Sequence, residues 1–256
     1  MKKIDIKENV FLYEFNDNNN NTDFNINITA IVDGSRALLI DTGYEEQAKL
    51  VKQDMMKNGI NVELVVLSHY HPDHISGCKA FKGCCFIGSK FYKYNLERCK
   101  IWFPDEEFIE PNILMGEKGS LKFGTHNMRF IHTPGHCKCS ISTVIDDEII
   151  HVGDLIMKSQ NGKNMLPYIS DDGDFKEHID SLHMIADLGY NTVLPSHGDV
   201  ITGNQEIKEM IFDRIYYLTK VNESKGELAL EDCLKQDIEN YDFLKYHEIN
   251  VKQLIL

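Results

Sequence analysis

The stretch VLSHYHPDHISG (66–77) concentrates three histidines and one aspartate within six positions, directly after an apolar run. The run Leu64–Leu67 is typical of a buried strand. His69 and His71 are two positions apart, so an extended chain would point both imidazoles the same way. Pro72 cannot continue a regular strand and turns the chain. Asp73 and His74, which follow it, can therefore face a second direction. Because zinc, iron and manganese accept imidazole and carboxylate ligands, the stretch predicts a metal site at a strand exit.

Three further candidate ligands lie at the ends of later apolar runs, each beside a residue that turns the chain. They are His136 in HTPGH, Asp154 in HVGD and His197 in LPSHG. Asp41, in LLIDTG, follows the expected buried strand Ala37–Ile40. Loops at strand ends are where a rigid scaffold holds binding and catalytic side chains, so these residues are candidates for a site.

The chain has two β-rich halves, each with helical segments, which favours an α/β (α+β) protein with two packed sheets and helices outside. The ordered motifs resemble those of the metallo-β-lactamase superfamily of metal-dependent hydrolases, over roughly residues 10–198. HYHPDH matches the family signature H-x-H-x-D-H, which is far more specific than a lone H-x-H. IDTG, HTPGH, GD and SHG accompany it in the family's order. The resemblance implies a four-layer αββα sandwich, here with extra C-terminal helices.

The resemblance also implies two bound divalent metal ions, with zinc expected and iron or manganese as alternatives. Three histidines would hold the first ion, an aspartate and two histidines the second, and a further aspartate would bridge both. In that order they are His69, His71 and His136; Asp73, His74 and His197; and Asp154. Asp41 would lie behind these ligands and orient their loop.

The function that the resemblance implies is hydrolysis by a hydroxide shared between the two metal ions. Metal binding lowers the pKa of water towards about 7, which makes a nucleophile at neutral pH without a serine or cysteine. Asp73 would orient this hydroxide or carry its proton. We expect an ester-like substrate bond, with a thioester or a lactone ahead of a phosphodiester.

Two alternatives stay open: a phosphodiesterase or nuclease, and an iron-binding redox or dioxygenase-type member of the same fold. Antibiotic-degrading β-lactamases typically lack the bridging aspartate and are secreted, so Asp154 speaks against them. Flavodiiron members carry a flavin domain and have a glutamate where this chain has His71. The tRNA-processing nucleases keep all seven ligands but add a basic extension that this sequence does not show.

The composition favours a small-molecule substrate over a polyanion. The formal net charge is −13 and no cluster of lysine and arginine stands out, which disfavours nucleic acid and anionic membrane as partners. The seven cysteines are an odd number spread along the chain, and no signal-peptide or bilayer-spanning pattern is present. We therefore expect a cytoplasmic protein without a disulfide framework; a homodimer is an open alternative.

We expect a single domain over residues 1–256, with a core of about 10–200 and a helical extension of about 204–256. The residues 44–59 have helical spacing, with Met56 expected on the buried face, and Ile101–Ser120 are expected to form a long irregular connection. Three segments are expected to form the substrate rim. They are the hairpin tip Asn16–Asn21, the aromatic connection Trp102–Phe108 and Met157–Tyr168.

Several other histidines and cysteines carry no family assignment. His132 and His151 are expected to be structural. Four more histidines are expected on the surface or on helices: His126, His178, His183 and His247. The pair Cys137 and Cys139 follows His136 directly, and its role stays open between packing and a thiolate ligand or redox function.

Overall fold

The computed structural model describes residues 1–16 and 25–254, and its largest feature is a seven-stranded sheet. In spatial order its strands are β1 (Lys2–Lys7), β2 (Val10–Phe15), β3 (Ile26–Asp33), β4 (Arg36–Ile40), β5 (Asn61–Val66), β6 (Cys85–Ser89) and β7 (Ile113–Met115). The strands β1 to β4 pair antiparallel, whereas β4 to β7 pair parallel.

A second sheet has six strands and faces the first. In spatial order they are β14 (Ile201–Thr202), β13 (Thr192–Pro195), β11 (Ile149–Gly153), β10 (Ile141–Ile145), β9 (His126–His132) and β8 (Lys118–Phe123). Within the described residues, β11 and β13 pair parallel, and the other neighbouring strands of this sheet pair antiparallel. The carboxyl ends of β9, β11 and β13 therefore lie at one edge of the sheet.

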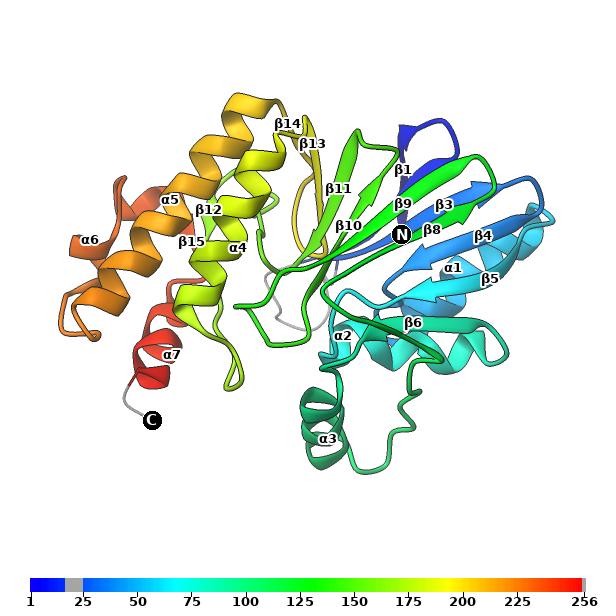
Figure 1. The fold of residues 1–256 in the computed structure, drawn as a ribbon, viewed down its shortest axis with the longest axis horizontal. Coiled ribbons are helices and arrows are strands. Elements are labelled where there is room, and N and C mark those ends of the chain that lie inside the picture. Colours follow the sequence, from blue (N-terminus) through cyan, green and yellow to red (C-terminus); the bar gives the residue numbers. More distant parts are fainter. Residues whose placement is uncertain (17–24, 255–256) are drawn as a thin grey trace.

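Helices cover the outer faces of both sheets (Figure 1). The first sheet is flanked by α1 (Glu45–Lys57), α2 (Pro72–Ile75), the 3-10 helix η1 (Ser76–Phe81) and α3 (Lys93–Trp102). The second sheet is covered by α4 (Phe175–Leu188) and α5 (Asn204–Glu223). The chain ends with α6 (Leu230–Cys233), the 3-10 helix η2 (Ile238–Asn240) and α7 (Lys245–Gln253). A short parallel pair, β12 (Asn164–Met165) with β15 (Tyr241–Asp242), ties this C-terminal part to the loop after β11.

Three layers of apolar side chains hold the four layers of backbone together. Between the sheets, residues such as Ile31 and Leu38 of the first sheet pack with Phe130 and Ile145 of the second. Two further clusters lie between each sheet and its helices. This arrangement confirms the expected αββα sandwich with added C-terminal helices. Within the part of the chain that the structure describes, no helix is both long and apolar enough to cross a bilayer.

Two details of the expected elements are wrong. The segment Ile101–Ser120 is not irregular throughout, because it contains β7 and the start of β8; a three-residue strand held by backbone pairing has no readable period. Met56 is 65% exposed, because α1 buries Ala48, Val51 and Met55 and the next position turns about 100° away from them. The expected hairpin tip Asn16–Asn21 lies outside the described residues, except for Asn16.

The N-terminus of α4 supports one of the loops that carry candidate ligands. Asp174 has an extended backbone, and its carboxylate accepts a hydrogen bond from the backbone N–H of Glu177, 2.8 Å away. Its own backbone N–H donates to the carbonyl of Gly135, next to His136. At Gly135 an added Cβ would lie 2.2 Å from the Cα of His178 on α4, so only glycine permits this approach. The helix cap therefore also fixes the loop.

We predict that Asp174→Ala lowers the free energy of unfolding by about 1 kcal/mol, because the backbone N–H of Glu177 in the first turn of α4 loses its acceptor. Urea unfolding measures this change, with an unchanged slope. Asp174→Asn is the control, since asparagine caps as well as aspartate. Equal destabilisation by both variants would contradict the capping role.

Candidate metal centre

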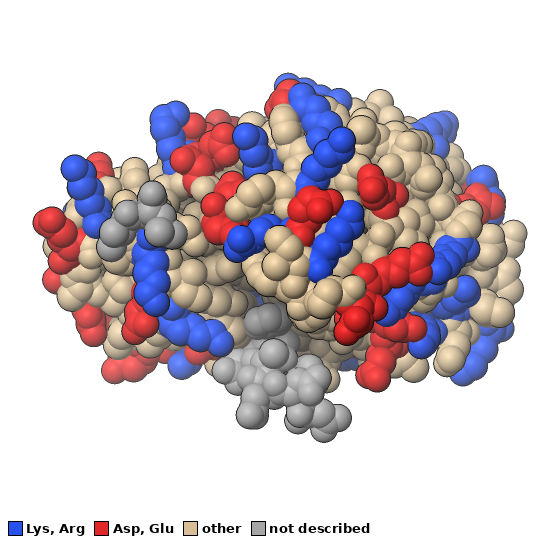
Figure 2. All heavy atoms as spheres, turned by 90° about the horizontal axis from the view of Figure 1, so that it is seen from below, with Lys and Arg blue, Asp and Glu red and all other residues tan. Residues whose placement is uncertain are grey.

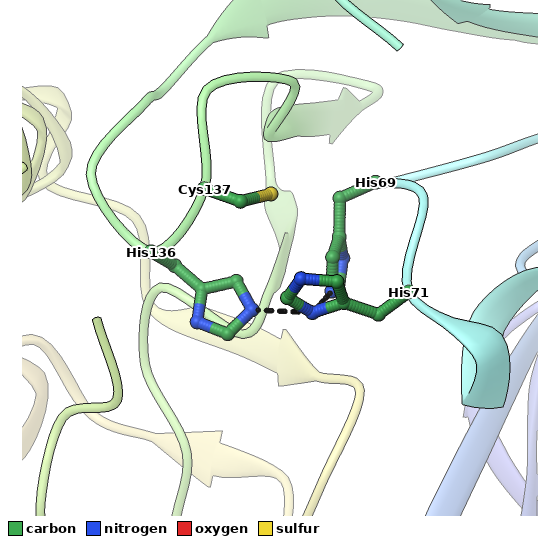
Figure 3. Close-up of side chains that lie close together, drawn as sticks. All are labelled: His69, His71, His136 and Cys137. Carbon is green, nitrogen blue, oxygen red and sulfur yellow. Dashed lines mark hydrogen bonds between the residues drawn. The ribbon is translucent and has the colours of Figure 1, made fainter. Parts of the chain in front are cut away.

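The first group of candidate ligands consists of His69, His71 and His136. His69 and His71 lie in the loop between β5 and α2, and His136 lies in the loop between β9 and β10. The Nδ1 atom of His71 lies 3.0 Å from Nε2 of His69 and 3.1 Å from Nε2 of His136 (Figure 3). Three ring nitrogens from two sheets thus converge on one point, as expected.

The second group consists of Asp73, His74 and His197. Asp73 and His74 are the second and third residues of α2, which begins at Pro72, and His197 follows β13. Oδ2 of Asp73 lies 3.1 Å from Nε2 of His197 and 3.6 Å from Nε2 of His74. The turn at Pro72 therefore directs Asp73 and His74 to the second group, whereas His69 and His71 before it belong to the first.

The carboxylate of Asp154 lies between the two groups. Its Oδ2 is 3.8 Å from Nε2 of His69 and 3.6 Å from Nε2 of His136. The same oxygen is 3.5 Å from Nε2 of His197, and Oδ1 is 3.5 Å from Nε2 of His74. All seven expected ligands are therefore brought together, with Asp154 in the position of a shared donor.

Hydrogen bonds on the far side of the rings fix their orientation. His136 donates from Nδ1 to the carbonyl of Tyr168 at 2.8 Å, and His197 donates from Nδ1 to the carbonyl of Asn25 at 2.7 Å. His74 uses Nδ1 with Oδ2 of Asp41, also at 2.8 Å. In each ring Nε2 is thereby directed toward the other candidate ligands, which is how metal-binding histidines are usually held.

Asp41 lies behind the candidate ligands and contacts residues that follow strands of both sheets. Its carboxylate accepts the backbone N–H and the hydroxyl of Ser68, each at 2.7 Å, and the hydroxyl of Ser196 at 3.0 Å. Its backbone has φ of +62°, a left-handed conformation that aspartate and asparagine tolerate better than most residues. Although burial raises the pKa of Asp41, the neighbouring His74 outweighs this effect and lowers it overall.

The two groups differ in their electrostatics. Burial lowers the pKa of His71 to about 3 and also lowers the pKa of His69 and of His136, so the first group offers neutral imidazoles. Burial would lower the pKa of His197 as well, but the carboxylates of Asp154 and Asp73 outweigh it and raise that pKa to about 10. The second group is therefore the more strongly anionic environment.

The residues fit divalent metal ions. Among the described residues, Nε2 of His74 and Oδ1 of Asp154 are buried polar atoms without a hydrogen-bond partner. Buried polar atoms are nearly always paired, so these two atoms point to a partner of another kind. Neutral imidazole nitrogens and carboxylate oxygens are ligands of zinc, iron and manganese, which makes a cation between them chemically suitable.

A cavity of about 200 Å³ opens beside the candidate ligands. Two of the three expected rim segments contribute to it, through Trp102 and through Met157 and Tyr168. Tyr246 of α7 also lines it, although α7 lies outside the three segments expected to form the rim. No local sequence pattern predicts that Tyr246 lines the cavity, because only the packing of α7 brings it there. A larger hollow of about 460 Å³ lies beside α1 and contains none of the candidate ligands.

The remaining histidines lie outside both groups. His132 bonds to Glu117 and to the carbonyl of Lys138, and His151 is fully buried, so both are structural as expected. His126 is not a surface residue, because it is buried on β9 beside Asp146. His178 is on a helix but fully buried, and its Nε2 donates to the carbonyl of Leu155.

We predict that Asp41→Asn weakens metal binding about 10- to 100-fold, because the amide can no longer accept from both serines and from His74 at once. Competition with a chromophoric chelator measures the affinity. Asp33→Asn is the matched control, since Asp33 ends the neighbouring strand β3 and pairs with Arg36 instead. An unchanged affinity in Asp41→Asn would contradict the orienting role.

Known proteins similar to this chain include two curated relatives. "Beta-lactamase-like protein 2 homolog" of Drosophila melanogaster is 25% identical over 205 residues, which cover 76% of this chain and 64% of that protein. The chain thus spans less than two thirds of the length of that relative. "Hydroxyacylglutathione hydrolase" of Francisella tularensis subsp. novicida (strain U112) is 24% identical over 204 residues, which cover 79% of this chain and 74% of that protein.

A solved structure shows the same fold. The "Metallo-beta-lactamase from Pontibacter korlensis" superposes with a TM-score of 0.67 at 17% identity, covering 84% of this chain and 98% of its own. The family profile described as "Metallo-beta-lactamase superfamily" matches residues 21–197, which is more than half of the chain. The chain therefore belongs to the metallo-beta-lactamase superfamily.

Proposed function

We propose that the protein is a dinuclear metal-dependent hydrolase that cleaves an ester-like bond in a small molecule, with a thioester or a lactone as the substrate class. The observation that carries this proposal is the place of Asp154, whose two oxygens face histidines of both candidate groups at 3.5 to 3.8 Å. A carboxylate so placed favours two ions that share a ligand over two independent sites.

The candidate ligands would divide the work between two positions. His69, His71 and His136 would hold the first ion, and Asp73, His74 and His197 the second, with zinc as the expected metal. Bound divalent ions supply a lowered pKa for water and a Lewis acid for a carbonyl oxygen. Asp73 lines the cavity, so its carboxylate can orient the attacking water and accept a proton from it.

The walls of the cavity favour a substrate without negative charge near the scissile bond. Trp102, Tyr168 and Tyr246 offer aromatic surface beside Met157. Among the described residues that line this cavity there is no lysine or arginine. A phosphodiester in this cavity would find no lysine or arginine there to match its charge. An acyl group next to a thioester or lactone carbonyl suits apolar walls better.

The thioester alternative has one further support. The Francisella tularensis relative is named a hydroxyacylglutathione hydrolase, and an acyl group joined to glutathione sulfur is a thioester. Its identity to this chain is 24%, so we extend to this protein the bond class and not the substrate.

The face seen from below gives no reason to prefer a nucleic acid. Figure 2 shows lysine and arginine interspersed with aspartate and glutamate on that face, and no continuous basic stripe crosses its described part. Nucleases need a basic track along the phosphates, so this face favours the small-molecule proposal.

We predict that the protein loaded with zinc hydrolyses a panel thioester or lactone and that chelation abolishes turnover reversibly. The panel contains S-acylglutathiones, γ-lactones and bis(p-nitrophenyl) phosphate, and each is followed with apo, zinc-loaded and iron-loaded protein. Turnover of the phosphodiester alone would replace the proposal by the phosphodiesterase alternative. Zinc loading without turnover, together with redox chemistry of the iron form, would replace it by the iron alternative.

We predict that Asp73→Asn lowers kcat by about 10²- to 10⁴-fold, because the amide can neither accept the proton nor complete the second position. Asp199→Asn is the matched control, since Asp199 follows His197 closely but lies outside both candidate groups. Metal content is measured on both variants. A kcat for Asp73→Asn within threefold of the parent would contradict the assignment.

A further inference from the structure

A thiol lies within the first group of candidate ligands. Cys137 is fully buried and directly follows His136 in the loop between β9 and β10. Its sulfur and one ring nitrogen each of His69, His71 and His136 all lie within 4.8 Å of one another. Figure 3 shows the side chain of Cys137 extending from the loop toward His69, with the rings of His71 and His136 beside it. The cluster therefore has four donors, of which the family resemblance assigned three.

The neighbouring thiol of Cys139 has different surroundings. Its sulfur accepts the backbone N–H of Tyr70 at 3.3 Å and the side-chain N–H of Asn95 at 3.2 Å. Cys137 instead contacts the hydroxyl of Ser140 at 3.2 Å and the sulfur of Cys139 at 3.6 Å. Because both of these contacts are to neutral groups, the sulfur of Cys137 can exchange them for a bond to a cation. Of the two thiols, only Cys137 belongs to the four-donor cluster.

The spacing of the four atoms is close to that of donors around one zinc ion. Zinc binds histidine nitrogen at about 2.0–2.1 Å and cysteine sulfur at about 2.3 Å, which places tetrahedral donors roughly 3.3–3.6 Å apart. The His71 nitrogen already lies 3.0 and 3.1 Å from its two neighbours. No two of the four donor atoms are more than 4.8 Å apart, so side-chain adjustments of about 1 Å bring them to the spacing of zinc ligands.

We propose that Cys137 is an additional protein ligand of the first metal position, so that a thiolate joins the three histidines and the shared carboxylate of Asp154 in binding thiophilic divalent cations such as Zn²⁺, Co²⁺ and Cd²⁺. The inference rests on the metal site of the proposed function and adds a ligand to it. On binding, the S–H bond breaks, the sulfur lone pair forms the bond to the cation, and the proton leaves to solvent.

The two positions would then differ in their selectivity. The first would offer three imidazoles and a soft thiolate, whereas Asp73, His74 and His197 offer harder oxygen and nitrogen ligands. Thiolates select soft cations, so Cd²⁺ and Zn²⁺ would fill the first position before the second.

The test is the electronic spectrum of the protein loaded with two equivalents of Co²⁺, with bound cobalt measured on the same samples. We expect an intense near-ultraviolet sulfur-to-cobalt charge-transfer band in the parent protein and in Cys139→Ser, and its loss in Cys137→Ser. Cys139→Ser is the matched control because it removes an equally buried thiol two residues away. Cd²⁺ affinity of the first position should fall at least about tenfold in Cys137→Ser only.

Each result separates this inference from the proposed function. If two Co²⁺ bind and the parent protein shows no such band, Cys137 is not a ligand while the dinuclear site stands. A band that persists in Cys137→Ser overturns the inference as well. If no Co²⁺ binds, the proposed function fails first. Should Cys137→Ser not fold, X-ray absorption at the cobalt edge of the parent protein decides, since a sulfur neighbour supports the inference and its absence overturns it.

Discussion

The buried carboxylate of Asp41 is the constraint on which the site depends. It follows β4, yet it accepts hydrogen bonds from Ser68 after β5, from Ser196 after β13 and from His74 on α2. Loops from both sheets are therefore tied to one anion. A buried carboxylate that accepts this many hydrogen bonds stays ionised and loses much if any partner is removed. The separation of the two sheets at this edge is thereby set where the candidate ligands meet.

Buried hydrogen bonds also hold candidate ligands that do not contact Asp41. Backbone carbonyls of Asn25 and Tyr168 accept from His197 and His136, so segments far apart in sequence orient these rings. Gly198 has φ of +93°, and an added Cβ would lie 1.2 Å from the carbonyl oxygen of Lys158, so close backbone contact also fixes the loop of His197. Such indirect support preorganises a metal site, because the rings cannot turn away without breaking buried hydrogen bonds.

The candidate ligands and their positions at strand ends could be predicted from the sequence. Contacts that arise only from the packing of distant elements could not. HYHPDH, Asp154 and His197 each stand beside a turn former after an apolar run, so their placement at one edge could be predicted. Tyr246 reaches the cavity only because α7 packs beside the loop that follows β11. The strand β7 shows no period because three residues are too few. The C-x-C pattern left the role of Cys137 open, because its distance to the imidazoles depends on the fold.

Anomalous diffraction from crystals grown with zinc tests the central claim most directly, because it locates each ion without reference to any substrate. A dinuclear centre predicts two zinc peaks, one among His69, His71 and His136 and one among Asp73, His74 and His197, with the carboxylate of Asp154 contacting both. A single peak, or two peaks that do not share Asp154, would contradict it.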